Sequence, residues 1–252
     1  MIKTTDPKEI DFKNLFSLKE KVIIIVGNKG LIGKAFEEAC IQFGAIVVGF
    51  DLPEYNVKDE ASVNDFKNSV IEKYGKIDGL VNCHHSKPEG FFDIVENYTE
   101  DAWDEVMNSN LKGTHTMCKI IGSYMAENGG GSIVNLASTY SVVAPNHKIY
   151  NGIKKALKSP ASYAASKGGI MALSNYLATY WADKNIRVNM ITPHGVWNKH
   201  EKKFEENFSE LSPMKRLSYN YEVAGGLVYL LSDAASYVTG HNLIIDGGWT
   251  AW

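Results

Sequence analysis

The sequence predicts an α/β fold in which helices cover both faces of one parallel sheet. Two observations carry this prediction. Short β-branched runs alternate with helical segments along the whole chain, and a glycine-spaced turn joins the first run to the first helix. Strands that are buried on both faces read as continuous apolar runs, and parallel strands need crossover connections that are usually helical. A length of 252 residues is ordinary for one domain of this kind.

The expected elements follow one another in a regular order. Strands are expected at 21–27, 45–50, 77–82, 132–136, 187–191 and 242–245. Helices are expected at 34–43, 61–74, 103–127, 161–184 and 221–231. This alternation favours a doubly wound sheet of about seven strands in a single domain, 18–252, after an N-terminal extension, 1–17. An insertion at 139–162 and a polar flap at about 194–215 interrupt the pattern.

Composition argues against several functional classes. The net charge is −3 and the pI is about 6.2, so nothing favours a nucleic-acid partner. No apolar run reaches the roughly 18 residues that span a bilayer, and the polar start has no signal-peptide core. The three cysteines lack metal-ligand spacing, as expected in a reducing compartment. We therefore expect a cytoplasmic protein that acts on a small molecule.

The glycine-spaced turn indicates a dinucleotide site. Gly27, Gly30 and Gly33 lie between the first strand and the first helix, where glycine lets the backbone approach a pyrophosphate at the helix N-terminus. Asp51 ends the second strand, where a carboxylate can accept hydrogen bonds from both adenosine ribose hydroxyls and repel a 2′-phosphate. This context predicts a Rossmann-type fold that binds NAD rather than NADP. A surface aspartate that opens a turn is the simpler alternative for Asp51.

Several residues in the second half resemble the short-chain dehydrogenase/reductase family. The strand at 132–136 runs into Ser138, Tyr163-Ala-Ala-Ser-Lys167 is similar to the family's Tyr-x-x-x-Lys signature, and Asn110 matches its asparagine. Further matches in family order lie at Asn82, at Arg187-Val-Asn189 with Pro193, and at Tyr237-Val-Thr-Gly240 with Asp246-Gly-Gly248. The resemblance extends over about 20–250 and implies an NAD(P)-dependent oxidoreductase that transfers a hydride between nicotinamide and a carbonyl or secondary alcohol.

The resemblance also implies the roles of the site residues. Tyr163 would exchange a proton with the substrate, Ser138 would bind the substrate oxygen, Lys167 would hold the ribose, and Asn110 would keep a water near Lys167. The Lys167 ammonium and the nicotinamide charge are expected to lower the pKa of Tyr163. Cofactor contacts are implied for Gly27, Lys29, Leu31, Ile32, Gly33, Asp51, Asn56, Val57, Asn82, Tyr163, Lys167, Pro193 and Val196.

The Tyr-x-x-x-Lys pattern is not unique in this chain. It occurs at Tyr150/Lys154, Tyr163/Lys167 and Tyr180/Lys184. Tyr150 is the serious rival, because its separation from Ser138 is nearer the usual family interval. Gly152 weakens any helix there, whereas Tyr163 follows Ser159-Pro160, a suitable N-cap and first helical residue. We therefore assign Tyr163, and we expect Tyr180, late in its helix, to be structural.

Other positions depart from the family pattern. Val26 replaces a threonine, Leu31 stands where glycine is usual, and His194 replaces the glycine of Pro-Gly. Cys83-His84-His85 replaces Asn-Ala-Gly and brings bulky rings to the edge of the cofactor site. Adjacent histidines cannot chelate as a helical i, i+4 pair does, so no metal is expected. These changes leave room for altered cofactor affinity.

The insertion points toward the substrate. Residues 139–162 contain four lysines and His147 but no acidic residue, beside the expected substrate mouth. Positive charge there favours an anionic, sugar-like substrate, although a solvated lysine face is an equally simple interpretation. Candidate substrate contacts are Tyr140, His147, Lys154 and His194. The insertion is similar to that of dehydrogenases encoded with bacterial flagellin and surface-glycan modification genes.

Two other functions remain open. The glycine spacing is similar to that of sugar-nucleotide epimerases and dehydratases, although those usually have a longer C-terminal substrate domain. The unusual residues around the cofactor site would also suit a regulatory or partner protein with reduced activity. The resemblance further implies a homotetramer or homodimer, formed through the helices after Asn110 and Tyr163.

Overall fold

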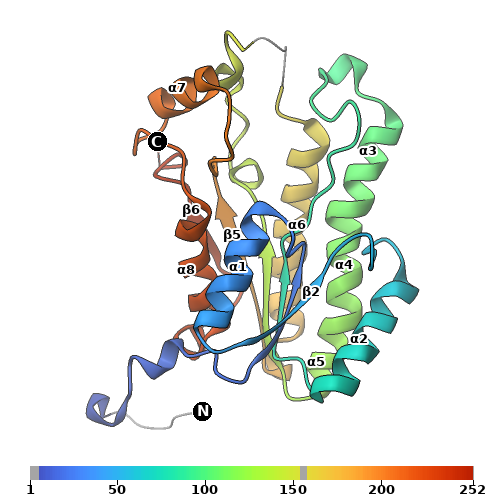
Figure 1. The fold of residues 1–252 in the computed structure, drawn as a ribbon, viewed down its shortest axis with the longest axis vertical. Helices are drawn as coiled ribbons and strands as arrows, with labels where there is room; N and C mark the ends of the chain where they lie inside the picture. Colours follow the sequence, from blue (N-terminus) through green and yellow to red (C-terminus); the bar gives the residue numbers. More distant parts are fainter. Residues whose placement is uncertain (1–5, 154–157, 252) are drawn as a thin grey trace.

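A computed structural model describes residues 6–153 and 158–251 and shows one parallel six-stranded sheet in the order β2-β1-β3-β4-β5-β6 (Figure 1). The strands are β1 (Val22–Val26), β2 (Ile46–Phe50), β3 (Gly79–Asn82), β4 (Gly131–Leu136), β5 (Ile186–Pro193) and β6 (Asn242–Ile245). Every neighbouring pair is parallel, which confirms the predicted doubly wound α/β fold. The strand order reverses between β1 and β3, and ligands of such sheets bind at the carboxyl ends beside that point. No helix of the described part is both long and apolar enough to cross a membrane.

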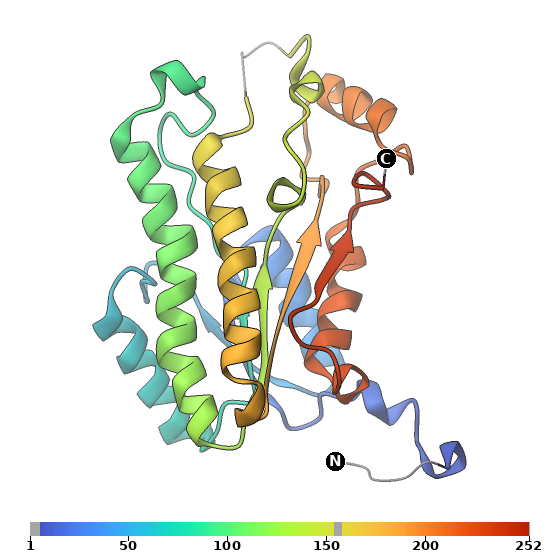
Figure 2. The same cartoon turned by 180° about the vertical axis from the view of Figure 1, so that it is seen from behind.

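Helices form a layer on each face of the sheet (Figures 1 and 2). One layer contains α1 (Leu31–Gln42) and α8 (Asn220–Leu231); the other contains α2 (Glu60–Tyr74), α3 (Glu100–Val106), α4 (Gly113–Met117), α5 (Ser123–Glu127) and α6 (Ala161–Tyr180). The alternation of side chains along β1 explains both layers. Ile23 packs in the same apolar cluster as Phe36 of α1, and Ile24 packs in the cluster of Met117 and Leu177 on the opposite face.

The described sheet has six strands, not the expected seven or so. β2 lies at one edge of the sheet and β6 at the other, and only residues 51–59, which include Pro53, connect β2 to α2. A crossover between parallel strands needs a dozen or more residues, usually a helix. The connection is therefore too short to add a strand beyond β2 before α2 begins.

The helix predicted at 103–127 is continuous from α3 to α5 but is not uniform. Two π-helical stretches interrupt it, at Met107–Lys112 and at Cys118–Gly122. Each π turn widens the helix locally, and such turns are frequent at functional sites. Asn110 lies in the first stretch, so the backbone geometry alone indicates a functional site at this turn.

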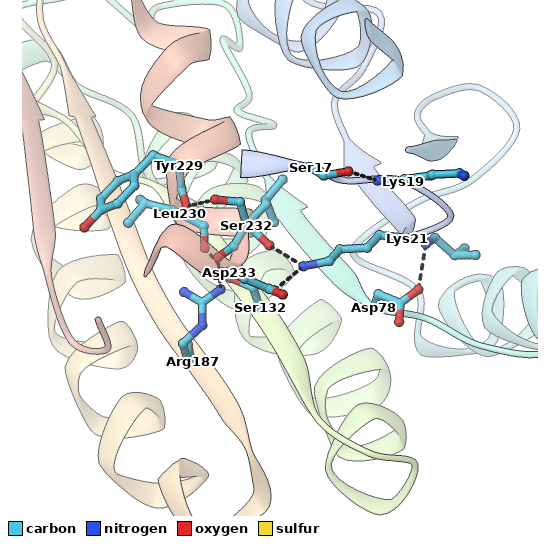
Figure 3. Close-up of polar contacts among 12 residues, drawn as sticks. Ser17, Lys19, Lys21, Asp78, Ser132, Arg187, Tyr229, Leu230, Ser232 and Asp233 are labelled. Carbon is cyan, nitrogen blue, oxygen red and sulfur yellow. Dashed lines mark hydrogen bonds and ion pairs between the residues drawn. The ribbon is translucent and has the colours of Figure 1, made fainter. Parts of the chain in front are cut away.

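The amino edge of the sheet is fastened to the end of α8 (Figure 3). The carbonyl groups of residues 230–232 accept hydrogen bonds from three directions: Ser132 Oγ at 2.9 Å, Lys21 Nζ at 3.3 Å and an Arg187 guanidinium nitrogen at 3.2 Å. Cations at a helix C-terminus also interact favourably with the helix dipole. The polar groups at the amino edge therefore stabilise the fold, and a ligand-binding site is expected at the carboxyl edge.

The insertion and the flap meet above the carboxyl edge, on the side toward which the strand arrows point (Figure 1). The described part of the insertion contains two short 3-10 helices, Thr139–Ser141 and His147–Tyr150, and the flap contains α7 (Lys202–Leu211). Asn207 Nδ2 of α7 donates to the carbonyls of Ile149 (3.2 Å) and Asn151 (2.7 Å). The two segments are thus fastened together.

Candidate active site

A cavity of about 270 Å³ lies at the carboxyl ends of the strands, below α7. Ser138, Tyr140, Tyr150, Tyr163 and His194 all contribute to its wall. Ile32, Pro193 and Val196, three of the expected cofactor residues, line the same space. The fold therefore places the predicted cofactor end and the predicted chemical end side by side.

The turn after β1 has the shape that a pyrophosphate requires. Gly27 has a φ of 86°, and a Cβ on Gly33 would overlap the Gly27 carbonyl and lie 2.8 Å from Asn28 Cα. α1 begins with Gly30 as its N-cap, and no side chain of the described residues caps its first turn. The N–H groups of that turn are free to bind an anion, so the residues fit a dinucleotide.

The end of β2 carries negative charge toward this turn. The Asp51 carboxylate accepts the Lys29 N–H at 3.0 Å and the Leu52 N–H at 2.8 Å. The Lys29 ammonium pairs with Glu54 at 2.6 Å. Asp51 thus binds the backbone of the glycine turn while Glu54 holds the Lys29 side chain, and two carboxylates lie near the turn at the end of β2. Carboxylates at this place in the fold can accept ribose hydroxyls and disfavour an added phosphate.

Ser138, Tyr163 and Lys167 come together as the sequence predicts. Ser138 follows β4 and hydrogen-bonds the Tyr163 phenol, which lies one turn of α6 before Lys167. Lys167 Nζ donates to the Leu136 carbonyl at 2.5 Å and lies 5.6 Å from the centroid of the Tyr163 ring. One side-chain hydroxyl and one phenol thus line the cavity, and one buried ammonium lies a turn further along α6.

Burial is the largest influence on the pKa values of Tyr163 and Lys167 in the protein without cofactor. Burial raises this pKa above the ordinary value of 10, and the Ser138 hydrogen bond opposes the rise. Burial also lowers the pKa of Lys167 from 10.5 to about 8. Lys167 is not among the groups that shift the pKa of Tyr163 in the protein without cofactor, so the lowering expected from Lys167 and the nicotinamide charge stays a prediction for the cofactor complex.

Asn110 connects two parts of the site. Its side chain is fully buried in the first π stretch; Oδ1 accepts the Ser86 N–H at 2.9 Å, and Nδ2 donates to Ser166 Oγ at 3.2 Å. Ser86 belongs to the loop after β3, and Ser166 directly precedes Lys167. Asn110 therefore fastens the β3 loop to the catalytic turn of α6.

The insertion contributes hydroxyl groups to the cavity. Ser159 Oγ lies within hydrogen-bond distance of the Tyr140 hydroxyl (3.3 Å) and the Tyr150 hydroxyl (3.5 Å), and its single proton can be donated to one of them at a time. The sequence predicts Ser159 as the N-cap of α6, but the structure does not place it there. Pro160 takes that position, and α6 begins at Ala161, because the Ser159 side chain is turned toward the two tyrosines.

Of the other candidates on the insertion, Tyr150 lines the cavity and His147 does not. Tyr150 ends a 3-10 helix, and Gly152 follows with a φ of 73°, so the chain leaves helical geometry after Tyr150. Tyr150 contributes to the cavity wall as a further hydroxyl. His147 is exposed and does not line the cavity, contrary to expectation, because its short helix turns it outward. Lys154 lies outside the described residues.

His194, a predicted substrate contact, lines the cavity within an aromatic cluster. Its ring lies 4.2 Å from the Trp249 ring and 4.9 Å from the Phe208 ring, measured between centroids. Nδ1 lies 2.6 Å from Thr139 Oγ1, and burial lowers the pKa of the imidazole to about 4. His194 is therefore neutral and adds no charge to the cavity.

Asn82, a predicted cofactor contact, has a structural role in the sheet. Asn82 is buried and donates to Asn135 Oδ1 at 2.8 Å, so it braces β3 against β4.

Sequence reasoning missed the aromatic wall formed by Phe91, Phe204 and Phe208. The i, i+4 spacing of the last two on the flap was the available signal, since it predicts an amphipathic helix with a buried face.

Comparisons with known proteins agree with this geometry. A family model described as short chain dehydrogenase matches residues 35–208. An NAD-dependent glycerol dehydrogenase of Listeria innocua is 38% identical, over 95% of this chain and 97% of the relative. Post-translational flagellin modification protein A of Campylobacter coli is 28% identical, over 92% and 99%. The crystal structure of a short chain dehydrogenase from Leptospira borgpetersenii with bound NAD+ superposes with a TM-score of 0.85 at 28% identity, covering 99% of this chain and 97% of that one.

Proposed function

The chain belongs to the short-chain dehydrogenase family, and we propose that it oxidises a secondary alcohol of a small polyol or sugar, with NAD as the hydride acceptor. The protein is an NAD(P)-dependent oxidoreductase. The observation that carries the more specific proposal is the meeting of Ser138 and Tyr163 in one cavity, with Lys167 one turn away and the glycine turn beside it.

The chain's own residues handle the proton of the alcohol. Bound nicotinamide supplies the acceptor for the hydride that leaves the carbon. Ser138 donates a hydrogen bond to the substrate oxygen, and Tyr163 takes the hydroxyl proton. Burial raises the pKa of Tyr163, so the phenolate depends on nearby positive charge, which Lys167 provides from one turn away. Asn110 positions the loop that faces this turn and is proposed to complete the proton path.

The cavity wall supports a polyhydroxylated, uncharged substrate. Tyr140, Tyr150 and Ser159 form a hydrogen-bonded group of hydroxyls, and His194 is neutral. Among the described lining residues, Lys87 is the one with a formal charge. Sites built from hydrogen-bonding groups discriminate strongly in favour of substrates that carry matching hydroxyls. The Listeria innocua relative is named for glycerol, which is a substrate of this class.

An anionic sugar is the second candidate. Lys148 and Lys158 are exposed on the insertion, while Lys154 and Lys155 lie outside the described residues. The flagellin modification relative also supports a link to surface-glycan metabolism. A KM that rises steeply with salt, and no longer does so after Lys154 and Lys155 are changed to Gln, would favour this candidate. An unchanged salt dependence would favour the neutral polyol.

The compartment and the assembly are part of the same proposal. The three cysteines of the chain, Cys40, Cys83 and Cys118, are buried and free, which suits a reducing cytoplasm. We propose a homodimer or homotetramer in that compartment.

The test compares two tyrosines of the repeated motif on α6. Purified protein is screened against a panel of polyols with NAD and NADP, and the Tyr163→Phe and Tyr180→Phe variants follow. Tyr163→Phe should lower kcat by about a thousandfold or more without changing NAD affinity or Tm. Tyr180→Phe, an exposed position, should behave as wild type. NAD binding without turnover of any alcohol would instead support a regulatory protein.

A further inference from the structure

His85 is a histidine on the cavity wall that the proposed chemistry does not use. It stands where the family pattern has a glycine, and it adds a ring to the cavity on the side of the β3 loop. Its side chain keeps exposed surface at the cavity, although dense packing around the ring and the nearby Lys167 lower the pKa of the imidazole well below 6.5. A neutral imidazole offers one donor and one acceptor.

The backbone that carries His85 is held on both sides. The preceding residue, His84, donates from Nε2 to the Ser109 carbonyl at 3.0 Å, since a carbonyl can only accept. The following residue, Ser86, donates its N–H to Asn110 Oδ1 at 2.9 Å. Both anchors belong to the same π stretch, so the His85 ring is presented to the cavity from a rigid support.

The ring lies beside the proposed proton acceptor. The His85 and Tyr163 ring centroids are 6.3 Å apart with the planes at 73°, and the Tyr140 ring approaches Tyr163 at 6.3 Å and 88°. Phe91 also packs edge-on against Tyr163, at 6.2 Å. Within the described residues, neither ring nitrogen of His85 has a hydrogen-bond partner, whereas the hydroxyls of Tyr140 and Tyr150 share Ser159.

We propose that His85 determines specificity by binding the hydroxyl on the carbon adjacent to the carbon that is oxidised. This inference rests on the proposed alcohol oxidation. Ser138 and Tyr163 engage the reacting oxygen, and His85 lines the same cavity with its ring centroid 6.3 Å from that of Tyr163, a spacing suited to a hydroxyl on the neighbouring carbon. The enzyme therefore prefers vicinal diols to simple secondary alcohols, because a diol satisfies the polar atoms of His85 and a mono-alcohol leaves them unmatched.

The experiment uses two matched substrates, 2,3-butanediol and 2-butanol, which differ by one adjacent hydroxyl. His85→Phe keeps an aromatic ring of similar size and removes both hydrogen-bonding nitrogens; His85→Gln keeps a donor and an acceptor. Wild type should favour the diol in kcat/KM. His85→Phe should lower kcat/KM for the diol about tenfold or more and leave 2-butanol within about twofold, while His85→Gln should recover part of the preference.

A control and two further measurements keep the outcomes distinct. His241→Phe makes the same change at an exposed histidine beside the amino end of β6 and should alter neither substrate. Fluorescence titration of NAD and Tm should be unchanged in His85→Phe. Equal losses for both substrates, or weaker NAD binding, would overturn the inference, because His85 would then serve the cofactor or the fold. Absence of turnover by wild type with either cofactor would overturn the proposed function, and the inference with it.

Discussion

Tyr163 and Lys167 show how burial changes single residues at this site. Both groups are desolvated, so burial shifts the pKa of each toward its uncharged form. The pKa of Lys167 is about 8 in the folded protein and 10.5 when unperturbed. Below pH 8 both states are protonated, and the folded state bears the full cost of a buried ammonium. Between these two values the unfolded state binds more protons, so stability rises with pH.

The first prediction follows from this sign. Lys167→Met should raise the free energy of unfolding near pH 7, and its advantage over wild type should shrink between about pH 8 and 10.5. The total change is on the order of 3 kcal/mol, because each pKa unit corresponds to about 1.4 kcal/mol. Urea unfolding at several pH values measures it. Lys184→Met, at an exposed position, is the control, and an advantage that stays constant with pH would contradict the prediction.

Asp51 carries the prediction about cofactor choice. Its carboxylate and that of Glu54 would face a 2′-phosphate, and removal of one of them weakens the repulsion. Asp51→Ala should raise the ratio of kcat/KM for NADP over NAD about tenfold or more, mainly through loss of NAD affinity. Steady-state kinetics with both cofactors tests this, with Glu54→Gln as a comparison. An unchanged ratio would contradict the prediction and would favour the alternative, in which Asp51 only stabilises the turn after β2.

At the scale of elements, the junction of β1 and α1 leaves no room for a side chain at Gly33. The Gly33 position faces the Gly27 carbonyl so closely that any Cβ forces the turn apart. Gly225, inside α8, has nothing within 4 Å of such an atom. The same substitution should therefore have opposite effects in the two helices.

The matched variants Gly33→Ala and Gly225→Ala test this contrast. Gly33→Ala should weaken NAD binding at least tenfold and lower stability by roughly 1–3 kcal/mol, the usual cost of overpacking. Gly225→Ala should raise stability by about 0.5–1 kcal/mol with NAD affinity unchanged, since alanine restricts the unfolded chain. Fluorescence titration and chemical unfolding report both effects. Equal behaviour of the two variants would contradict the overlap at Gly33.

Local pattern predicted the regular elements well because their signals lie within a few neighbouring residues. The apolar run before Gly27 and the alanine-rich helix after Pro160 were placed correctly. The cap of that helix was not, since Ser159 is turned away by tyrosines that lie up to 19 residues earlier. The π stretch around Asn110 was also unforeseen, because no local rule distinguishes it from an ordinary helix.

At the scale of the whole molecule, exposed aromatic surface remains outside the site. Tyr176 and Tyr180 of α6 stack at 5.7 Å and are about 60% exposed, and Trp103 of α3 is exposed beside the same layer of helices. Aromatic surface of this kind marks association sites on soluble proteins. This layer contains the helices from which the resemblance predicts self-association.

The final prediction concerns that layer. Tyr176→Glu combined with Tyr180→Glu should lower the mass of the assembly measured by light scattering, while the secondary structure measured by circular dichroism is retained. Tyr237→Glu, at an exposed tyrosine outside this layer, is the control. A wild-type monomer, or a double variant that assembles normally, would exclude this face as the interface.

Sequence alone determined the class of sheet and the glycine turn after the first strand, because both depend on periodicity or spacing, which short stretches of chain express without their partners. The Ser138, Tyr163 and Lys167 set came from the resemblance to a known family and from the helix start that precedes Tyr163. Only the tertiary structure decided that Tyr150 and His85 line the same cavity, that His147 does not, and that burial raises the pKa of Tyr163. Those outcomes depend on desolvation and on distances between segments far apart in the chain, and both quantities exist only once the sheet and its two helical layers have formed.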